Sequence, residues 1–194
     1  IYMDDDRVCS IHDVALLGRH NLQNVCAAIA ATWDIIDNNA AVITKAVQEY
    51  KGLPHRLELV REVNGIKYFD DSFSTTPSSA AVAMEAVKGE KIMILGGSDK
   101  GIAFDELADA VIANKIKAVI QIGQMGPAIE ATLRSRGYSS IHDGGSSMKT
   151  IIAQANNIAR SGDSVILSPA CASFDMFKDY IDRGEQFHQV VDSL

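Results

Sequence analysis

The chain has 194 residues, of which 47% are hydrophobic, and its formal net charge is −7 at pH 7. This length and apolar content support at least one packed core and argue against a largely disordered chain. The negative charge disfavours unspecific nucleic-acid binding, which needs a basic face. No run of about 18 apolar residues could cross a membrane. The three cysteines form no paired motif, so a cytoplasmic protein without disulfide bonds or a zinc knuckle is expected.

The first part of the chain predicts short strands followed by two helices. Strands are expected at 1–3, 8–11 and 14–17, with the first opening a hairpin. Asn21 is expected to cap a helix that runs through residue 31, because apolar residues recur there at helical spacing. Asn39 is expected to cap a second helix over 40–50, with Gly52 after its end. Two helices without a complete sheet predict that residues 1–52 are the end of a preceding domain, and that the chain is the C-terminal piece of a longer protein.

From residue 53 onward, strands alternate with helices. An Asn64-Gly65 turn predicts a hairpin between strands at 57–63 and 66–70. Further strands are expected at 91–95, 118–122, 140–142 and 164–167, and helices at 77–87, 104–113, 127–136, 147–160, 177–181 and 185–191. Such alternation is typical of right-handed βαβ units. The predicted fold class is therefore α/β: over residues 53–194, a Rossmann-like, doubly wound and mostly parallel sheet with an antiparallel hairpin.

The stretch from Tyr68 to Pro77 is expected to organise this domain. It reads as a strand, a polar loop and a helix start, in which Thr76 caps the helix and Pro77 takes its first position. The loop offers the carboxylate of Asp71 and several hydroxyl groups at the carboxyl edge of a parallel sheet, where α/β proteins bind ligands. The polar loops at 71–76, 96–101, 123–126, 143–146 and 168–174 are all expected at that edge. On its own, the 71–76 loop is equally well explained as a helix cap with solvated neighbours.

Two other loops carry candidate binding groups. The 96–101 loop places Lys100 among glycines, but it matches neither nucleotide phosphate-binding pattern, and the whole chain contains neither. Lys100 is thus a solvated lysine or a cation for a carboxylate ligand. In the 168–177 stretch, Ser173 can bind a ligand or cap the next helix, a position for which Asp175 competes. Cys171 is expected to be a small buried thiol rather than a nucleophile.

The histidines show no spacing typical of a metal site. His12, His142 and His188 are expected at the surface. His20 and His55 are of more interest, because each stands beside a glycine or proline at an element boundary.

Four motifs occur in an order that resembles the Mur ligases. They are 18–24 (GRHNLQN), 52–56 (GLPHR), 71–76 (DSFSTT) and 168–177 (SPACASFDMF). The resemblance extends from Leu17 to Phe187, and the last motif is most similar to family members that add D-glutamate. It implies an ATP-dependent acid–amino-acid ligase of peptidoglycan synthesis. The implied partners are ATP, D-glutamate and UDP-N-acetylmuramoyl-L-alanine, and a monomer is expected.

The resemblance also implies roles for individual residues. Residues 1–52 would end a central ATP-binding domain, whose upstream part would carry the phosphate loop and the Mg²⁺ ligands, so no metal ligand is expected in this chain. The implied ATP-binding residues are Asn21 and Asn24 beside the adenine, His55 and Arg56 near the nucleotide, and Asp71 near the ribose. The implied D-glutamate-binding residues are Thr75, Lys100, Ser173, Phe174 and Tyr180. Lys100 is also the implied catalytic residue of the chain.

One departure from the family pattern leaves alternatives open. Many relatives read Asp-Ser-Lys-Ala-Thr-Asn where this chain has Asp71–Thr76, so Phe73 replaces a lysine. The loss of a cation puts the amino-acid specificity in question. A ligase for another amino acid, similar to the folate-polyglutamate relatives, remains an alternative. A non-catalytic Rossmann-type module that binds a nucleotide or an amino acid is another.

Overall fold

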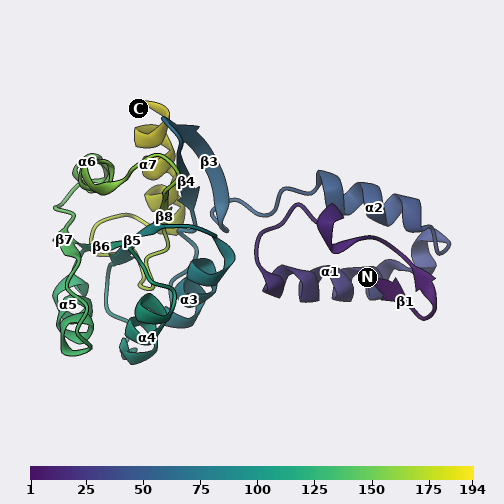
Figure 1. The fold of residues 1–194 in the computed structure, drawn as a ribbon, viewed down its shortest axis with the longest axis horizontal. Helices are drawn as coiled ribbons and strands as arrows, with labels where there is room; N and C mark the ends of the chain where they lie inside the picture. Colours follow the sequence, from purple (N-terminus) through teal and green to yellow (C-terminus); the bar gives the residue numbers. More distant parts are fainter. The chain divides into compact units, whose positions relative to one another are not determined.

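The structure is a computed structural model that describes all residues from 1 to 194. The chain divides into two compact units, Ile1–Leu53 and Pro54–Leu194 (Figure 1). None of its helices combines the length and apolar character needed to cross a lipid bilayer.

The first unit is a small α-helical unit with one short hairpin. The hairpin pairs β1 (Tyr2–Met3) with β2 (Asp6–Arg7), as the sequence predicts for its start. The two main helices are α1 (Arg19–Thr32) and α2 (Ala40–Glu49), and 3-10 turns lie at Ile11–Asp13 and Asp34–Ile36. The core consists of Val8, Cys9, Val25, Ile29, Trp33 and Ile43. The predicted cap of the second helix is confirmed, because Asn39 Oδ1 accepts hydrogen bonds from two backbone amides of α2.

Three predictions for this unit are wrong. Residues 8–11 and 14–17 form no strands, because Val8 and Val14 pack against the core of the unit instead of pairing in a sheet. The first helix begins at Arg19 after Gly18, and not at an Asn21 cap. The side chain of Asn21 lies inside the first turn, where its amide donates to the Leu17 carbonyl at 2.7 Å.

The second unit is built on a six-stranded sheet. The strands are β3 (Glu58–Val63), β4 (Ile66–Asp70), β5 (Lys91–Gly96), β6 (Ala118–Ile122), β7 (Ile141–Asp143) and β8 (Ser164–Leu167), and their order is β3-β4-β8-β5-β6-β7. Only β3 runs antiparallel, paired with β4 through the predicted turn at Asn64-Gly65. The predicted mostly parallel sheet with one hairpin is therefore confirmed.

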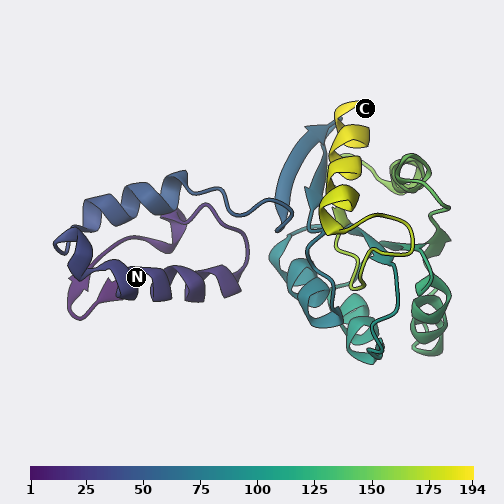
Figure 2. The same ribbon diagram turned by 180° about the vertical axis from the view of Figure 1, so that it is seen from behind.

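Helices cover both faces of this sheet (Figures 1 and 2). One face packs against α3 (Pro77–Ala86), α4 (Asp105–Ala113) and α5 (Gly126–Ser135), and the other against α6 (Met148–Ile158) and α7 (Tyr180–Asp192). Alternation along β5 shows why: Met93 and Leu95 belong to the first core, whereas Ile92 and Ile94 belong to the second. The predicted Thr76 cap of α3 is confirmed by its capping box.

The end of the chain differs from the sequence prediction. A single helix, α7, replaces the two short helices expected at 177–181 and 185–191, and Asp179 caps it. Gly184 lies inside this helix rather than between two helices. A Cβ at Gly184 would collide with Nδ1 of His55 and lie 2.6 Å from Oδ2 of Asp70. The glycine therefore permits close approach of the helix to its neighbours, and does not end it.

Gly96 ends β5 at a point where no side chain fits. Its φ of +126° disfavours residues with a Cβ, and a Cβ there would collide with the carbonyl oxygen of Ile122 on β6. The backbone amide of Gly96 donates to Pro169 O at 2.8 Å, which ties the end of β5 to the loop after β8. Gly96 thus sets how closely these loops approach one another.

We predict that Gly96→Ala destabilises the chain by at least about 2 kcal/mol more than Gly137→Ala. Gly137 is a matched control, because its φ is +80° but a Cβ added there would meet nothing within 4 Å. Urea denaturation of both variants measures the difference. Equal losses of stability would mean that backbone conformation alone, and not close approach to β6, requires the glycine.

Candidate functional site

The loops that follow β4, β5 and β8 meet at the carboxyl edge of the sheet. The amide of Ser98 donates to Ala172 O at 2.8 Å, which joins the loop after β5 to the loop after β8. The amide of Ala170 donates to Ser74 O at 3.0 Å, which joins the loop after β8 to the loop after β4. The sequence prediction that these polar loops share one edge is confirmed by these contacts.

A buried arginine on α7 holds this edge together. The Arg183 side chain is fully buried and has no carboxylate within ion-pair distance. Its Nε donates to Ser72 Oγ at 2.9 Å, its Nη2 to Ser72 O at 2.8 Å, and its Nη1 to Cys171 O at 3.3 Å. The Ser72 hydroxyl in turn donates to Tyr180 O at 2.7 Å. Burial lowers the pKa of Arg183 to about 10, so the guanidinium stays charged at neutral pH and carries all of these hydrogen bonds.

Asp71 is a buried acceptor in the same loop. Its Oδ1 accepts from the Leu57 amide at 3.1 Å, and its Oδ2 accepts from the Ser168 hydroxyl at 2.6 Å. Burial raises the pKa of Asp71 to about 6, and the hydrogen bond from Ser168 opposes that rise. The carboxylate therefore joins three segments: the one before β3, the end of β4 and the end of β8. Its predicted contact with a ribose stays a prediction.

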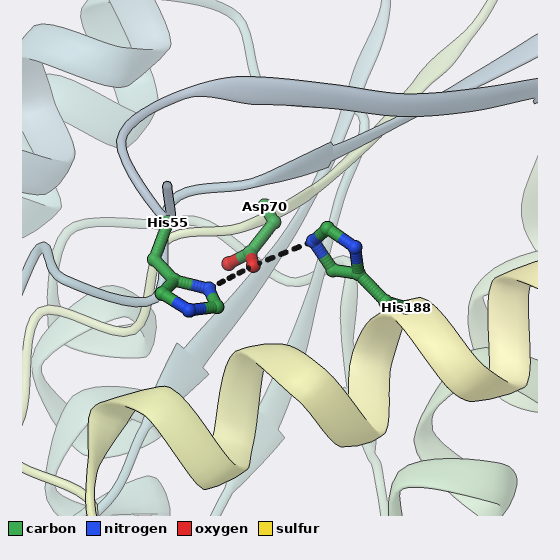
Figure 3. Close-up of side chains that lie close together, drawn as sticks. All are labelled: His55, Asp70 and His188. Carbon is green, nitrogen blue, oxygen red and sulfur yellow. Dashed lines mark hydrogen bonds and ion pairs between the residues drawn. The ribbon is translucent and has the colours of Figure 1, made fainter. Parts of the chain in front are cut away.

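Asp70, the last residue of β4, binds two histidines (Figure 3). Its Oδ2 lies 2.7 Å from Nδ1 of His55 and 3.0 Å from Nε2 of His188, while its Oδ1 accepts from the Ser72 amide at 2.8 Å. Because a carboxylate only accepts hydrogen bonds, the histidine nitrogens that face it carry protons. His188 was expected at the surface, but it lies half-buried on α7 and takes part in this cluster. The expectation was wrong because Asp70 and His188 are far apart in sequence.

Lys100 and Thr75 are brought together across the edge. Nζ of Lys100 donates to Thr75 Oγ1 at 3.3 Å, and Lys100 is otherwise exposed. Ser173 is buried, whereas Phe174 is 74% exposed. The cation that the sequence offered for a carboxylate ligand is thus beside a hydroxyl from a different loop and open to solvent.

Phe73 lies between a cation and a second aromatic ring. The Arg56 guanidinium is 4.0 Å from the centre of the Phe73 ring, within the range of a cation–π contact. The Tyr180 ring meets Phe73 edge to face at 4.6 Å between centroids. Tyr180 also lies 6.0 Å from the His55 ring. The Arg56 guanidinium therefore places a positive charge beside Phe73, the residue that stands where many relatives have a lysine.

Three non-glycine residues around this edge have a left-handed backbone conformation. His55, Leu57 and Ala170 adopt φ values of +60°, +47° and +61°, although none is a glycine. Such conformations cost on the order of 1–3 kcal/mol each and persist only where the surroundings enforce them. Here the His55 carbonyl accepts from the Phe73 amide at 3.1 Å, and the other two residues donate to the loop after β4 or to Asp71. These hydrogen bonds tie all three residues to the loop after β4.

The two asparagine candidates are hydrogen-bonded to each other. In α1 of the first unit, the side-chain amide of Asn24 donates to Asn21 Oδ1 at 3.2 Å. Cys171 is buried, and its burial raises the pKa of the thiol to about 12, which disfavours a thiolate at neutral pH. The expectation of a small buried thiol is confirmed.

Comparison with protein families decides the assignment of the second unit. The family model described as "Mur ligase, glutamate ligase domain" matches residues 55–171, more than half of the chain. The chain belongs to the Mur ligase family. The resemblance inferred from the four motifs is thereby confirmed.

Relatives extend the match over both units of this Mur ligase chain. UDP-N-acetylmuramoylalanine–D-glutamate ligase of Acetivibrio thermocellus is 38% identical over 98% of this chain and 41% of its own length. The enzyme of the same name from Lachnospira eligens is 40% identical over 98% of this chain and 42% of its own. The chain therefore spans about two-fifths of the length of these relatives.

Solved structures agree with the Mur ligase fold. UDP-N-acetylmuramate-alanine ligase from Thermotoga maritima matches with a TM-score of 0.66 at 16% identity, covering 93% of this chain and 39% of that protein. Folylpolyglutamate synthase from Mycobacterium tuberculosis, complexed with ADP and AMPPCP, matches with a TM-score of 0.62 at 15% identity, covering 81% and 39%. At these identities the likeness establishes the fold of the chain.

Within this Mur ligase domain, sequence reasoning missed Arg183 and His188, and it named the Ser72 hydroxyl without its partner. Arg183 and Ser72 contact each other across more than a hundred residues, and no short motif connects them. One signal was available in the sequence: Arg183 occupies a position of α7 that faces the apolar core. A charged residue at such a position must have hydrogen-bond acceptors nearby. Sequence periodicity along 180–192 therefore could have identified Arg183, but not its partners.

The raised pKa of Asp71 predicts a pH-dependent loss of stability. The folded-state pKa of about 6 lies above the value of about 3.9 for an unfolded aspartate, so the folded chain holds this proton more tightly. The stabilisation is complete below pH 4 and is lost as the pH rises through 6, which amounts to about 3 kcal/mol. Relative to the native chain, Asp71→Asn should therefore gain up to that amount between pH 4 and pH 7. Urea denaturation across this range measures it, and a difference that does not vary with pH would contradict the buried, protonatable Asp71.

Proposed function

We propose that this chain is the C-terminal part of an ATP-dependent ligase that joins D-glutamate to UDP-N-acetylmuramoyl-L-alanine. The observation that carries the proposal is the exposed Lys100 beside Thr75 at the carboxyl edge, in a chain whose relatives bear the name of that ligase over nearly its whole length. An ammonium beside a hydroxyl is suited to a carboxylate, and D-glutamate carries two. In a complete protein, residues 1–52 would belong to the ATP-binding domain and residues 53–194 to the amino-acid-binding domain.

The proposed reaction forms an amide in three steps. The γ-phosphoryl group of ATP passes to the carboxylate of the alanine, which leaves ADP and an acyl phosphate. The amine of D-glutamate then attacks the acyl carbon, and the tetrahedral intermediate collapses to the amide with release of phosphate. Because phosphates and several carboxylates share one site, fixed cations are needed to offset their mutual repulsion. Lys100 supplies such a cation from this chain.

The roles proposed for the other residues divide between the two substrates. Asn21, Asn24, His55, Arg56 and Asp71 are assigned to ATP, and Thr75, Lys100, Ser173, Phe174 and Tyr180 to D-glutamate. The engagement of both Asp71 oxygens supports a role in fixing the loop after β4, and a ribose hydroxyl would have to share one of them. Arg56 lies over Phe73, so a cation assigned to ATP is next to the position where many relatives carry a lysine.

Mg²⁺ is assigned to residues outside this chain. Magnesium prefers oxygen ligands and retains several waters. The Asp71 carboxylate is buried and engaged by two donors, so it offers no open position for such an ion. Asp71 therefore fits Mg²⁺ poorly.

Phosphate release by the full-length protein tests the proposed function. It should require ATP, UDP-N-acetylmuramoyl-L-alanine and D-glutamate together, and L-glutamate or glycine should not replace D-glutamate. Turnover with another amino acid would favour a related ligase of different specificity. Binding of nucleotide without turnover under any of these conditions would favour a non-catalytic module.

We predict that Lys100→Met in the full-length protein raises the Michaelis constant for D-glutamate at least about tenfold, which corresponds to about 1.4 kcal/mol. Methionine keeps an apolar stem and deletes the charge, so the variant tests electrostatics rather than packing. The Michaelis constant for ATP should change much less. Steady-state phosphate release at varied D-glutamate measures both effects.

Lys88→Met is the matched control for this prediction. Lys88 is an exposed lysine between α3 and β5, at the opposite, amino end of the parallel strands. It should leave the Michaelis constant for D-glutamate within about twofold of the native value. A Lys100→Met enzyme that behaves like this control would identify Lys100 as a solvated loop residue.

A further inference from the structure

Three side chains from separate segments converge on one point beside the carboxyl edge (Figure 3). His55 precedes β3, Asp70 ends β4, and His188 lies on α7. Their Nδ1, carboxylate oxygen and Nε2 atoms all lie within 4.8 Å of one another. Asp70 is fully buried, and both imidazole rings present a nitrogen to the same oxygen, Oδ2. Of the three, only His55 has a role in the ligase reaction proposed above, near the nucleotide; Asp70 and His188 have none.

We propose that His55, Asp70 and His188 form a binding site for one divalent transition-metal ion, with Zn²⁺ as the representative ion. Two imidazole nitrogens and one carboxylate oxygen are a ligand set that Zn²⁺ and its neighbours accept. Oxygen-preferring ions such as Mg²⁺ and Ca²⁺ suit it poorly. The site is therefore distinct from the magnesium that the ATP reaction needs. Glu58 can supply a fourth ligand, since its Oε2 lies 4.0 Å from Nε2 of His188, or water can take that position.

The ion would replace the two hydrogen bonds that now hold the cluster. Zinc–ligand bonds of about 2.0–2.2 Å in a tetrahedral site place ligand atoms about 3.4 Å apart. The present separations of 2.7 and 3.0 Å must therefore open by roughly half an ångström. Each imidazole moves its proton from the nitrogen facing Asp70 to its other ring nitrogen, or releases it to solvent. The His188 side chain is 29% exposed, which gives both room for this movement and a path for the ion.

The surrounding backbone holds the ligands in place before any ion binds. Gly184 brings the backbone of α7 against His55 and Asp70, at a position where a Cβ would collide with them. His55 is fixed in a left-handed conformation with φ of +60°, and its amide donates to Glu58 Oε2 at 3.2 Å. Asp70 is oriented by the Ser72 amide on its other oxygen. Support of this kind around the ligands is typical of metal sites.

An ion here would fasten α7 to the end of β4 and to the segment before β3. That contact is close to the Arg183 hydrogen bonds on the same helix, but it does not involve Lys100 or Thr75. We therefore assign the ion a stabilising role, which binding and unfolding measurements can detect without the ligation reaction. Stabilisation rises with ion concentration, because the ion binds the folded chain in preference to the unfolded one.

Calorimetric titration of the chelator-treated 194-residue chain with Zn²⁺ tests the site. The native chain should bind one ion per chain at this site, and His188→Gln should weaken that binding by at least tenfold. Glutamine can still donate to Asp70, so the fold should be retained, as circular dichroism will show. His142→Gln is the matched control, since His142 is an exposed histidine on β7. It should bind Zn²⁺ as the native chain does.

Thermal unfolding provides an independent readout. Zn²⁺ should raise the melting temperature of the native chain and of His142→Gln, and should raise that of His188→Gln much less. Equal affinity of all three proteins for Zn²⁺, or no stoichiometric binding by the native chain, would overturn the proposal. The cluster would then be a hydrogen-bond network alone.

Discussion

The buried guanidinium of Arg183 is the contact on which the candidate site depends. Arg183 carries a charge and is among the largest fully buried side chains of the second unit. Its hydrogen bonds go to two backbone carbonyls and one hydroxyl, and none goes to a carboxylate. Hydrogen bonds to a charged group contribute about 1.5–3 kcal/mol each, and acceptors left unpaired in the interior cost a similar amount. Arg183 therefore fixes the loop after β4 and the loop after β8 against α7. Thr75 lies on the first of these loops, and Lys100 lies on the loop after β5, which the Ser98 amide joins to the loop after β8.

One helix serves both the site and its neighbouring cluster. Arg183 holds the loops, Gly184 permits close approach to His55 and Asp70, and His188 completes the cluster one turn later. The consecutive placement explains why a glycine is tolerated in the interior of α7, at a cost of about 1 kcal/mol in helix propensity. The strained backbone at His55 and Leu57 is stabilised from the same side, through Asp70 and Asp71. The carboxyl edge is thus a single hydrogen-bonded assembly rather than a set of separate loops.

Local patterns in the sequence predicted most of the second unit. Alternating apolar strands, the Asn64-Gly65 turn and the Thr76-Pro77 helix start each depend on neighbouring residues only, and the structure contains all of them. The site was predictable to the extent that polar loops after parallel strands share an edge. The Arg183, Ser72 and His188 contacts were not, because they join residues more than a hundred positions apart. In the first unit, Val8 and Val14 show the reverse error: apolar residues that resemble strands pack as irregular chain against two helices.

Hydrogen exchange in Arg183→Met tests whether this one side chain holds the edge together. In the native chain the amides of Ser72, Phe73 and Ser74 are all hydrogen-bonded. These amides should exchange at least about tenfold faster in the variant, since a loss of about 1.4 kcal/mol in local stability gives that factor. The amides of β5 should change less. Arg136→Met is the control, because Arg136 binds Asp105 and Asp109 at the surface, where ion pairs contribute little. Unchanged exchange at residues 72–74, or an equal change across β5, would contradict this role of Arg183.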